Sequence, residues 1–150
     1  MESDTWLDRY TFEKYVLDVA ISTLEHGGVT SKVDTYQFLP PIDAWGFPKY
    51  PGKTVVLQPD SDIAAALKLF IHKNSVHLHE SDAWLGTWVN PTTGCCYLDI
   101  TVICTRLEDA IQDAIERSKK ERRNIEALYN FKHNRTVYLN QAVTYRKDHE

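Results

Sequence analysis

The chain has 150 residues, of which 43% are hydrophobic, 25% are charged and 11% are aromatic. This length and composition predict one folded domain that needs no disulfide or metal for its stability, and they argue against a disordered chain. The formal net charge of −4 at pH 7 argues against attraction of the whole surface to nucleic acid or anionic lipid.

An amphipathic helix is predicted over residues 11–24, with Thr11 as a candidate amino-terminal cap and a glycine pair after its end. The residues of one face recur at helical spacing: Phe12, Tyr15, Val16, Val19, Ala20 and Thr23. Leu17, Ile21 and Leu24 add a second apolar flank. Two apolar flanks indicate either a helix packed between two layers or a helix used in self-association.

A strand that is half exposed or at a sheet edge is predicted over residues 29–39, where the two faces alternate moderately. An edge strand beside a helix with two apolar flanks leaves surface that a monomer would need to cover. We therefore expect a symmetric homodimer.

A stiff aromatic loop is predicted over residues 40–52, which hold four of the six prolines and several large side chains. Proline restricts the backbone, so this segment is not expected to form a helix or a central strand. Loops of this length are often functional. Trp45 and Phe47 are therefore either a flap that closes one end of the core or a lid over a binding site.

A short strand is predicted over residues 53–57, and the acidic segment 59–62 is typical of a helix start. A second helix is predicted after it, because Ile63, Leu67 and Phe70 lie at helical spacing.

The connection after this helix contains the densest run of potential metal ligands: His72, His77, His79, Glu80 and Asp82. His77 and His79 on one face of a strand could chelate zinc or a similar ion. Their spacing matches no zinc-hydrolase signature, and a solvated polar connection is the alternative. We expect no bound cofactor.

A β-hairpin is predicted from residues 84–89 and 96–104, because Asn90, Pro91 and Gly94 supply turn chemistry between them. The apolar face of the return strand includes Cys96 and Cys104, which are expected to be reduced core residues.

The opposite face of the hairpin is the surface expected to carry a function, and its candidate binding residues are Trp84, Trp88, Tyr97 and Asp99. Asp99 is either an exposed carboxylate paired with a neighbouring strand, or one half of a carboxylate pair for acid–base chemistry with Asp82 or Glu80.

A third helix is predicted to begin at a capping box formed by Thr105 and Glu108. Basic side chains gather at its end: Lys119, Lys120, Arg122 and Arg123. They either contact phosphates of a nucleic acid or complement the helix dipole on a solvated face. The acidic chain favours the second interpretation, so a nucleic-acid partner is not expected.

A final hairpin is predicted from residues 126–131 and 135–139, followed by a polar tail over 141–150. The order of elements becomes α-β-β-α-β-β-α-β-β. This order predicts a single α+β domain over residues 1–150, with about three helices packed on a mainly antiparallel sheet.

The acidic amino terminus has no apolar run, and no segment approaches the roughly 18 apolar residues of a membrane span. We therefore expect a cytoplasmic protein without a membrane partner. The glycines match no phosphate-binding spacing, so nucleotide cofactors are not indicated.

Part of the chain resembles a pattern in small uncharacterised proteins of actinobacteria and their phages. The matching segments are the hairpin 86–94, the Tyr97-Leu98-Asp99 triplet, the helix end 121–124 and residues 127–131. The resemblance covers about a third of the chain. It implies a phage or mobile-element accessory protein, and it carries over no catalytic residue.

Three functions follow from these patterns. The favoured one is a non-enzymatic protein that binds a host protein through Trp45, Phe47 and the Trp84/Trp88 strand. The first alternative is a small enzyme, metal-dependent or acting on a small molecule, centred on His77, His79 and Asp99. The second is a nucleic-acid-binding protein that uses the basic end of the third helix.

Overall fold

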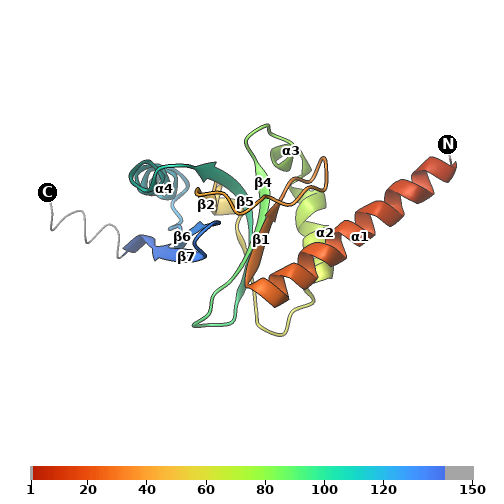
Figure 1. The fold of residues 1–150 in the computed structure, drawn as a ribbon, viewed down its shortest axis with the longest axis horizontal. Helices are drawn as coiled ribbons and strands as arrows, with labels where there is room; N and C mark the ends of the chain where they lie inside the picture. The colour runs from red at the N-terminus through yellow and green to blue at the C-terminus, as the bar shows by residue number, and fades with distance from the viewer. Residues whose placement is uncertain (1, 141–150) are drawn as a thin grey trace, which may run out of the picture.

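The protein is an α+β domain with helices packed on a seven-stranded antiparallel sheet, as the sequence predicts (Figure 1). The computed structural model describes residues 2–140, and the predicted polar tail over 141–150 lies outside them. The helices are α1 (Glu2–His26), α2 (Ile63–Lys73), α3 (Ser75–Leu78) and α4 (Leu107–Glu121), with a 3-10 turn at Pro51–Lys53. The strands are β1 (Gly28–Ser31), β2 (Trp45–Pro48), β3 (Val55–Leu57), β4 (Trp84–Val89), β5 (Cys96–Cys104), β6 (Ala127–Asn130) and β7 (Arg135–Tyr138).

The strands lie in the order β1-β4-β5-β2-β6-β7, and β3 pairs with another part of β5. The hairpin of β4 and β5 is the centre of this sheet and confirms the predicted strand pairing. Trp88 lies opposite Tyr97, and Gly86 lies opposite Asp99. Asn90 holds its turn by accepting hydrogen bonds from the backbone of Thr92 and Thr93. The final hairpin of β6 and β7 is also confirmed.

Strand β2 corrects the prediction of an aromatic loop. It is a central strand that pairs with β5 along its whole length and with β6 at Trp45 and Gly46. Pro48 is tolerated because it lies beyond the β6 ladder, so its missing N–H removes no bond from that side. The predicted strand over 29–39 is also shorter, since β1 ends at Ser31 and the chain then turns through Tyr36, which has a φ of 61°.

Two predicted helix starts are wrong. Helix α1 begins nine residues before the expected cap, and the Thr11 hydroxyl donates to the carbonyl of Leu7 inside the helix. Helix α4 has Arg106 at its N-cap position with no side-chain cap hydrogen bond, so Thr105 and Glu108 do not form the expected capping box. The start of α2 follows the prediction, because Asp62 accepts a hydrogen bond from the backbone N–H of Ala65.

The helices cover one face of the sheet, and two apolar clusters fill the space between them. The cluster under α1 and α2 includes Leu85, Leu98 and Ile100. The cluster under α4 includes Trp45 and Phe47. We call this side the helix-covered face. Figure 1 shows α1 and α2 towards one end of the sheet and α4 towards the other.

Cys96 is buried on the helix-covered face, and Cys104 is half buried against the second cluster. All three cysteines are free thiols. In the described part of the chain, no helix has the length and apolar character needed to cross a membrane.

Candidate functional site

The side of the sheet that faces away from the helices carries the candidate site. Side chains alternate along a strand, so the paired part of β4 and β5 presents six residues there, which we call the open face: Trp84, Gly86, Trp88, Tyr97, Asp99 and Thr101. The sequence therefore placed Trp84, Trp88, Tyr97 and Asp99 on the correct face. The rings of Trp88 and Tyr97 lie 5.2 Å apart between centroids.

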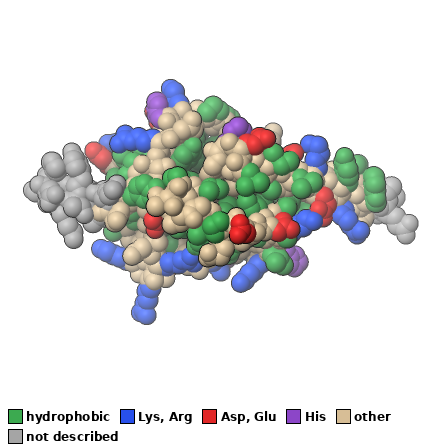
Figure 2. All heavy atoms as spheres, turned by 90° about the horizontal axis from the view of Figure 1, so that it is seen from below, with side chains coloured by type: hydrophobic (Ala, Val, Ile, Leu, Met, Phe, Trp, Pro, Cys, Tyr) green, Lys and Arg blue, Asp and Glu red, His purple; other side chains and the backbone are tan. Residues whose placement is uncertain are grey.

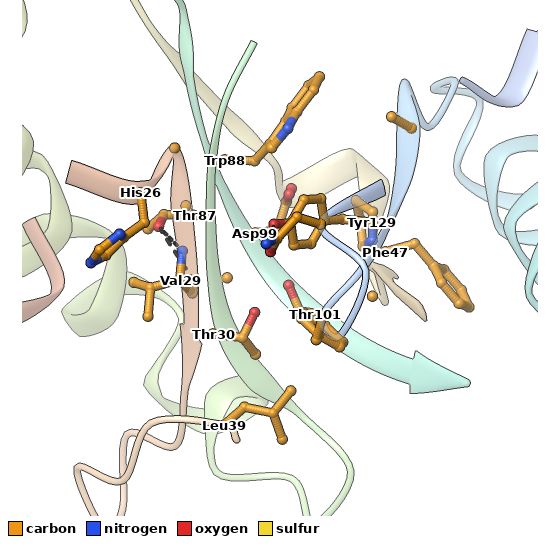
Figure 3. Close-up of a pocket in the computed structure, with 18 of the residues that line it drawn as sticks. His26, Val29, Thr30, Leu39, Phe47, Thr87, Trp88, Asp99, Thr101 and Tyr129 are labelled. Carbon is orange, nitrogen blue, oxygen red and sulfur yellow. Dashed lines mark hydrogen bonds between the residues drawn. The ribbon is translucent and has the colours of Figure 1, made fainter. Parts of the chain in front are cut away.

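The sheet curls around its open face. The ring centroid of Tyr138 on β7 lies 6.3 Å from that of Trp88 on β4, although three strands separate β4 and β7 in the sheet order. The curl encloses a cavity of about 550 Å³ whose floor is formed by open-face residues, together with Thr30 of β1 and Tyr129 of β6. Figure 3 shows Asp99 and Tyr129 near the middle of this space.

Two glycines shape the cavity floor. A Cβ atom on Gly86 would lie 2.0 Å from the Thr101 hydroxyl oxygen, and one on Gly46 would lie 2.4 Å from the Phe131 ring. Larger residues would therefore push these neighbours into the cavity. A glycine inside a strand often marks a close approach of this kind.

Asp99 is the only acidic side chain that lines the cavity in the described residues. Its carboxylate accepts a 2.5 Å hydrogen bond from the Thr54 hydroxyl. Burial raises the pKa of Asp99 from its ordinary value of 3.8 to about 6, and this outweighs the lowering by the Thr54 hydrogen bond and by the charge of Arg123. Asp99 therefore changes its charge close to neutral pH.

Arg123 reaches the same region from the end of α4. Its guanidinium donates a 2.6 Å hydrogen bond to the Thr54 carbonyl, so Thr54 links the carboxylate to the arginine. A second cavity of about 210 Å³ lies here, and Asp99, Trp88 and Tyr97 line it together with Arg123. Asp99 and Trp88 thus border both cavities.

The walls of the larger cavity are mainly apolar and aromatic. Besides Asp99, the ionisable side chains among its lining residues are His26 and Tyr129. The Tyr129 hydroxyl donates to Asn134, and burial raises the Tyr129 pKa. A mainly apolar cavity with one carboxyl whose pKa is shifted has the usual features of a small-molecule site.

Trp45 and Phe47 belong to the core, as the flap alternative predicts, and the alternative of a binding lid or contact surface at these two residues is wrong. They are only 6% and 3% exposed and pack in the cluster under α4. Phe47 borders the larger cavity, but Figure 3 shows that its ring points away from it. Trp84 is half buried, and the Lys32 ammonium lies 5.1 Å from its ring centroid. Trp88, Tyr97 and Asp99 are therefore the predicted binding residues that come together.

His77 and His79 do not lie on a strand as expected. His77 is in the short helix α3, and the His79 ring bonds the Ser75 carbonyl at the end of that helix. Among the described residues no group of three or more His, Cys, Asp or Glu side chains is placed to hold a metal ion.

The side chain of Lys49 lies between two acidic residues of the connection after α3. The Lys49 ammonium lies 2.5 Å from Asp82 and 3.0 Å from Glu80, and the Tyr50 hydroxyl donates to Glu80 at 2.7 Å. His77 Nδ1 lies 3.6 Å from Glu80. We call these five residues the Lys49 cluster. Neither Glu80 nor Asp82 lines a cavity with Asp99, so the proposed carboxylate pair does not form.

The basic side chains at the end of α4 do not all face solvent. Lys119, Lys120 and Arg122 are exposed, whereas Arg123 turns inward to Thr54. Arg122 ends the helix in the left-handed conformation, with a φ of 55°. Three of the four predicted cations therefore remain available to solvent on this surface.

Sequence reasoning missed Thr54, Tyr129 and Arg123 as neighbours of Asp99, because they come from segments 24 to 45 positions away and no local pattern connects them. Two signals were present: Gly46 and Gly86 each interrupt a strand on the cavity floor.

No protein-family model, curated protein or solved structure matches the chain. The resemblance to phage proteins, and the host-protein partner that it implies, therefore stay predictions.

Proposed function

We propose that the protein binds a small, mainly apolar organic cation in the cavity of the open face, with Asp99 as the group that pairs with its charge. The observation that carries this proposal is the state of Asp99. It is a carboxyl in a mainly apolar cavity, its hydrogen-bond partner Thr54 is neutral, and burial raises its pKa to about 6.

A bound cation would stabilise the ionised form of the buried Asp99 carboxyl. An ionised carboxylate is unfavourable in a place of low polarity unless an opposite charge lies close to it. A protonated amine would supply that charge and a charge-assisted hydrogen bond. An anionic ligand would instead be repelled by Asp99.

The shape and walls of the cavity fit the rest of such a molecule. A volume of about 550 Å³ lies within the range of small-molecule sites. Trp88 and Tyr129 offer aromatic surface to an apolar group, and aromatic faces also attract cations. This proposal shares Asp99 and a small-molecule ligand with the first alternative function derived from the sequence. It does not involve His77 and His79.

The test uses three probes of similar shape: 2-(1-naphthyl)ethylamine, the corresponding alcohol and 1-naphthylacetate. Isothermal titration calorimetry at pH 8 should show that the amine binds about tenfold more tightly than the alcohol, which corresponds to about 1.4 kcal/mol, and that the carboxylate binds most weakly. Asp99→Asn should remove the advantage of the amine, whereas Asp60→Asn, an exposed aspartate before α2, should leave it unchanged.

The pH dependence gives a second readout. Asp99 is ionised above its pKa of about 6, so the affinity for the amine should fall between pH 8 and pH 5 as the carboxyl takes up a proton. The affinity for the alcohol should change much less. Equal binding of amine and carboxylate, or an unchanged amine affinity in Asp99→Asn, would contradict the proposal.

A further inference from the structure

Helix α1 carries a second apolar stripe on the side that faces solvent. Its positions follow one another at intervals of three and four residues: Leu7, Tyr10, Lys14, Leu17, Ile21 and Leu24. The apolar members are between 50% and 72% exposed. Figure 2 shows hydrophobic side chains on the part of α1 that extends from the body.

The other side of α1 is already used by the domain. Tyr15, Val16 and Val19 are buried in the cluster that α1 shares with α2 and the sheet. The amino-terminal half of the helix continues beyond the body of the domain (Figure 1). The exposed stripe is therefore not needed for the core, although it runs along the same helix.

Intervals of three and four residues are the spacing by which one helix packs its side chains into another in a coiled coil. The stripe from Leu7 to Leu24 spans about 26 Å at a rise of 1.5 Å per residue. A shallow groove beside it continues from the stripe onto the loop after β1, and it is lined by Asp18, Ile21, Ser22, Tyr36 and Phe38.

We propose that this stripe packs against the same stripe of a second copy of the chain, with the two α1 helices antiparallel. Twofold symmetry makes each contact occur twice. An antiparallel alignment places Leu7 opposite Leu24 and Tyr10 opposite Ile21. The one charged member, Lys14, then lies opposite Leu17. This inference is independent of the ligand proposed for the open face.

The charge of Lys14 selects the antiparallel orientation. In a parallel pair, Lys14 would face Lys14 of the second copy in the middle of the stripe, so like charges would meet. In an antiparallel pair, Lys14 can lay its alkyl chain along Leu17. Its ammonium keeps the ion pair that it forms with Asp18 at 3.1 Å.

The first experiment measures the mass of the full chain in solution by light scattering. The wild type should be a dimer at about 50 μM, a concentration at which interfaces with micromolar dissociation constants are occupied. Leu17→Lys should give a monomer. Leu69→Lys is the matched control, since Leu69 is 74% exposed on α2 and outside the stripe, and it should remain a dimer. A monomeric wild type, or loss of the dimer in the control alone, would overturn the proposal.

The charge placed at position 17 tests the orientation. In the antiparallel dimer, Leu17→Lys faces Lys14 of the second copy, whereas Leu17→Glu faces the same lysine with the opposite charge. We therefore expect Leu17→Glu to retain at least tenfold more dimer than Leu17→Lys. In a parallel dimer position 17 faces itself, so equal dissociation of the two variants would overturn the antiparallel arrangement.

Cross-linking provides a readout that does not depend on a destabilising variant. Leu7→Cys and Leu24→Cys chains, distinguished by mass, are mixed and oxidised. The antiparallel dimer predicts a disulfide between the two different chains. A disulfide between two Leu7→Cys chains, or the same yield of cross-linked product from the wild-type chain with its native cysteines, would contradict it.

Discussion

The Lys49 cluster and the Asp99 cavity both hold carboxylates, but the protein shifts the pKa values of these carboxylates in opposite directions. Hydrogen bonds from Tyr50 and Lys49 lower the pKa of Glu80, and the bond from Lys49 lowers that of Asp82. Burial would lower the pKa of Lys49 itself, but its bonds to Asp82 and Glu80 outweigh this and raise it. Burial raises the pKa of Asp99, by contrast, because Thr54 and Arg123 do not compensate for it.

The difference separates a structural group from the group to which we assign ligand binding. The Lys49 cluster joins the end of β2 to the segment between α3 and β4, and both of its carboxylates pair with the Lys49 ammonium. Asp99 borders two cavities, and the Thr54 hydrogen bond and the charge of Arg123 only partly offset the effect of its burial. Groups that lower stability in this way are common where a protein has to meet a ligand.

The largest effect is expected from Asp99→Asn on stability. A carboxyl whose folded-state pKa lies above its unfolded value costs stability as the pH rises through the folded pKa. The difference between 3.8 and about 6 corresponds to roughly 3 kcal/mol above pH 7. Urea unfolding at pH 8 should therefore show that Asp99→Asn is more stable than the wild type by about that amount.

The same comparison at low pH is its control. Below about pH 3 the Asp99 carboxyl is protonated in both the folded and the unfolded chain, so the two proteins should have nearly equal free energies of unfolding. An Asp99→Asn variant that is less stable than the wild type at pH 8 would mean that the carboxylate is already compensated.

A smaller and opposite effect is expected from Lys49→Met. This change leaves Glu80 and Asp82 side by side without their cation and should lower the free energy of unfolding by about 2 kcal/mol at pH 7. Lys53→Met, an exposed lysine nearby, should change it by less than about 0.5 kcal/mol. Chemical denaturation at pH 7 measures both variants.

The pH dependence of Lys49→Met sharpens this prediction. Because the folded pKa values of Glu80 and Asp82 are lowered, their stabilisation is complete above pH 4.5 and is lost as the pH falls through those lowered values. The variant should therefore approach the stability of the wild type in acid. A constant difference down to pH 2 would contradict an electrostatic role for Lys49.

The smallest effect is expected from Thr54→Val, which removes the hydroxyl that bonds Asp99. The loss should raise the pKa of Asp99 above 6 and lower the free energy of unfolding by about 1 kcal/mol. Carboxyl NMR titration measures the first quantity. Thr105→Val, an exposed position after β5, should change neither the pKa nor the stability.

Much of the sheet could be predicted because its information is local. The turn chemistry between β4 and β5 fixed a hairpin, and alternation along its strands placed Trp88, Tyr97 and Asp99 on one face. The final hairpin and the cap of α2 were predictable for the same reason.

The remaining features depend on contacts between distant segments. Strand β2 contains Pro48 and a glycine, and it becomes a strand only because β5 and β6 flank it. Lys49 meets Asp82 across 33 positions of sequence. Neither the burial of Trp45 nor the curl that brings Tyr138 to Trp88 has a local signature.

The pKa of the Asp99 carboxyl, measured by carbon NMR titration and assigned by the missing signal in Asp99→Asn, tests the central claim most directly. A fold that leaves this charge for a cationic ligand predicts a value of about 6 in the free protein and a lower value when 2-(1-naphthyl)ethylamine is bound. A value of 4 or less in the free protein, unchanged by the amine, would contradict it.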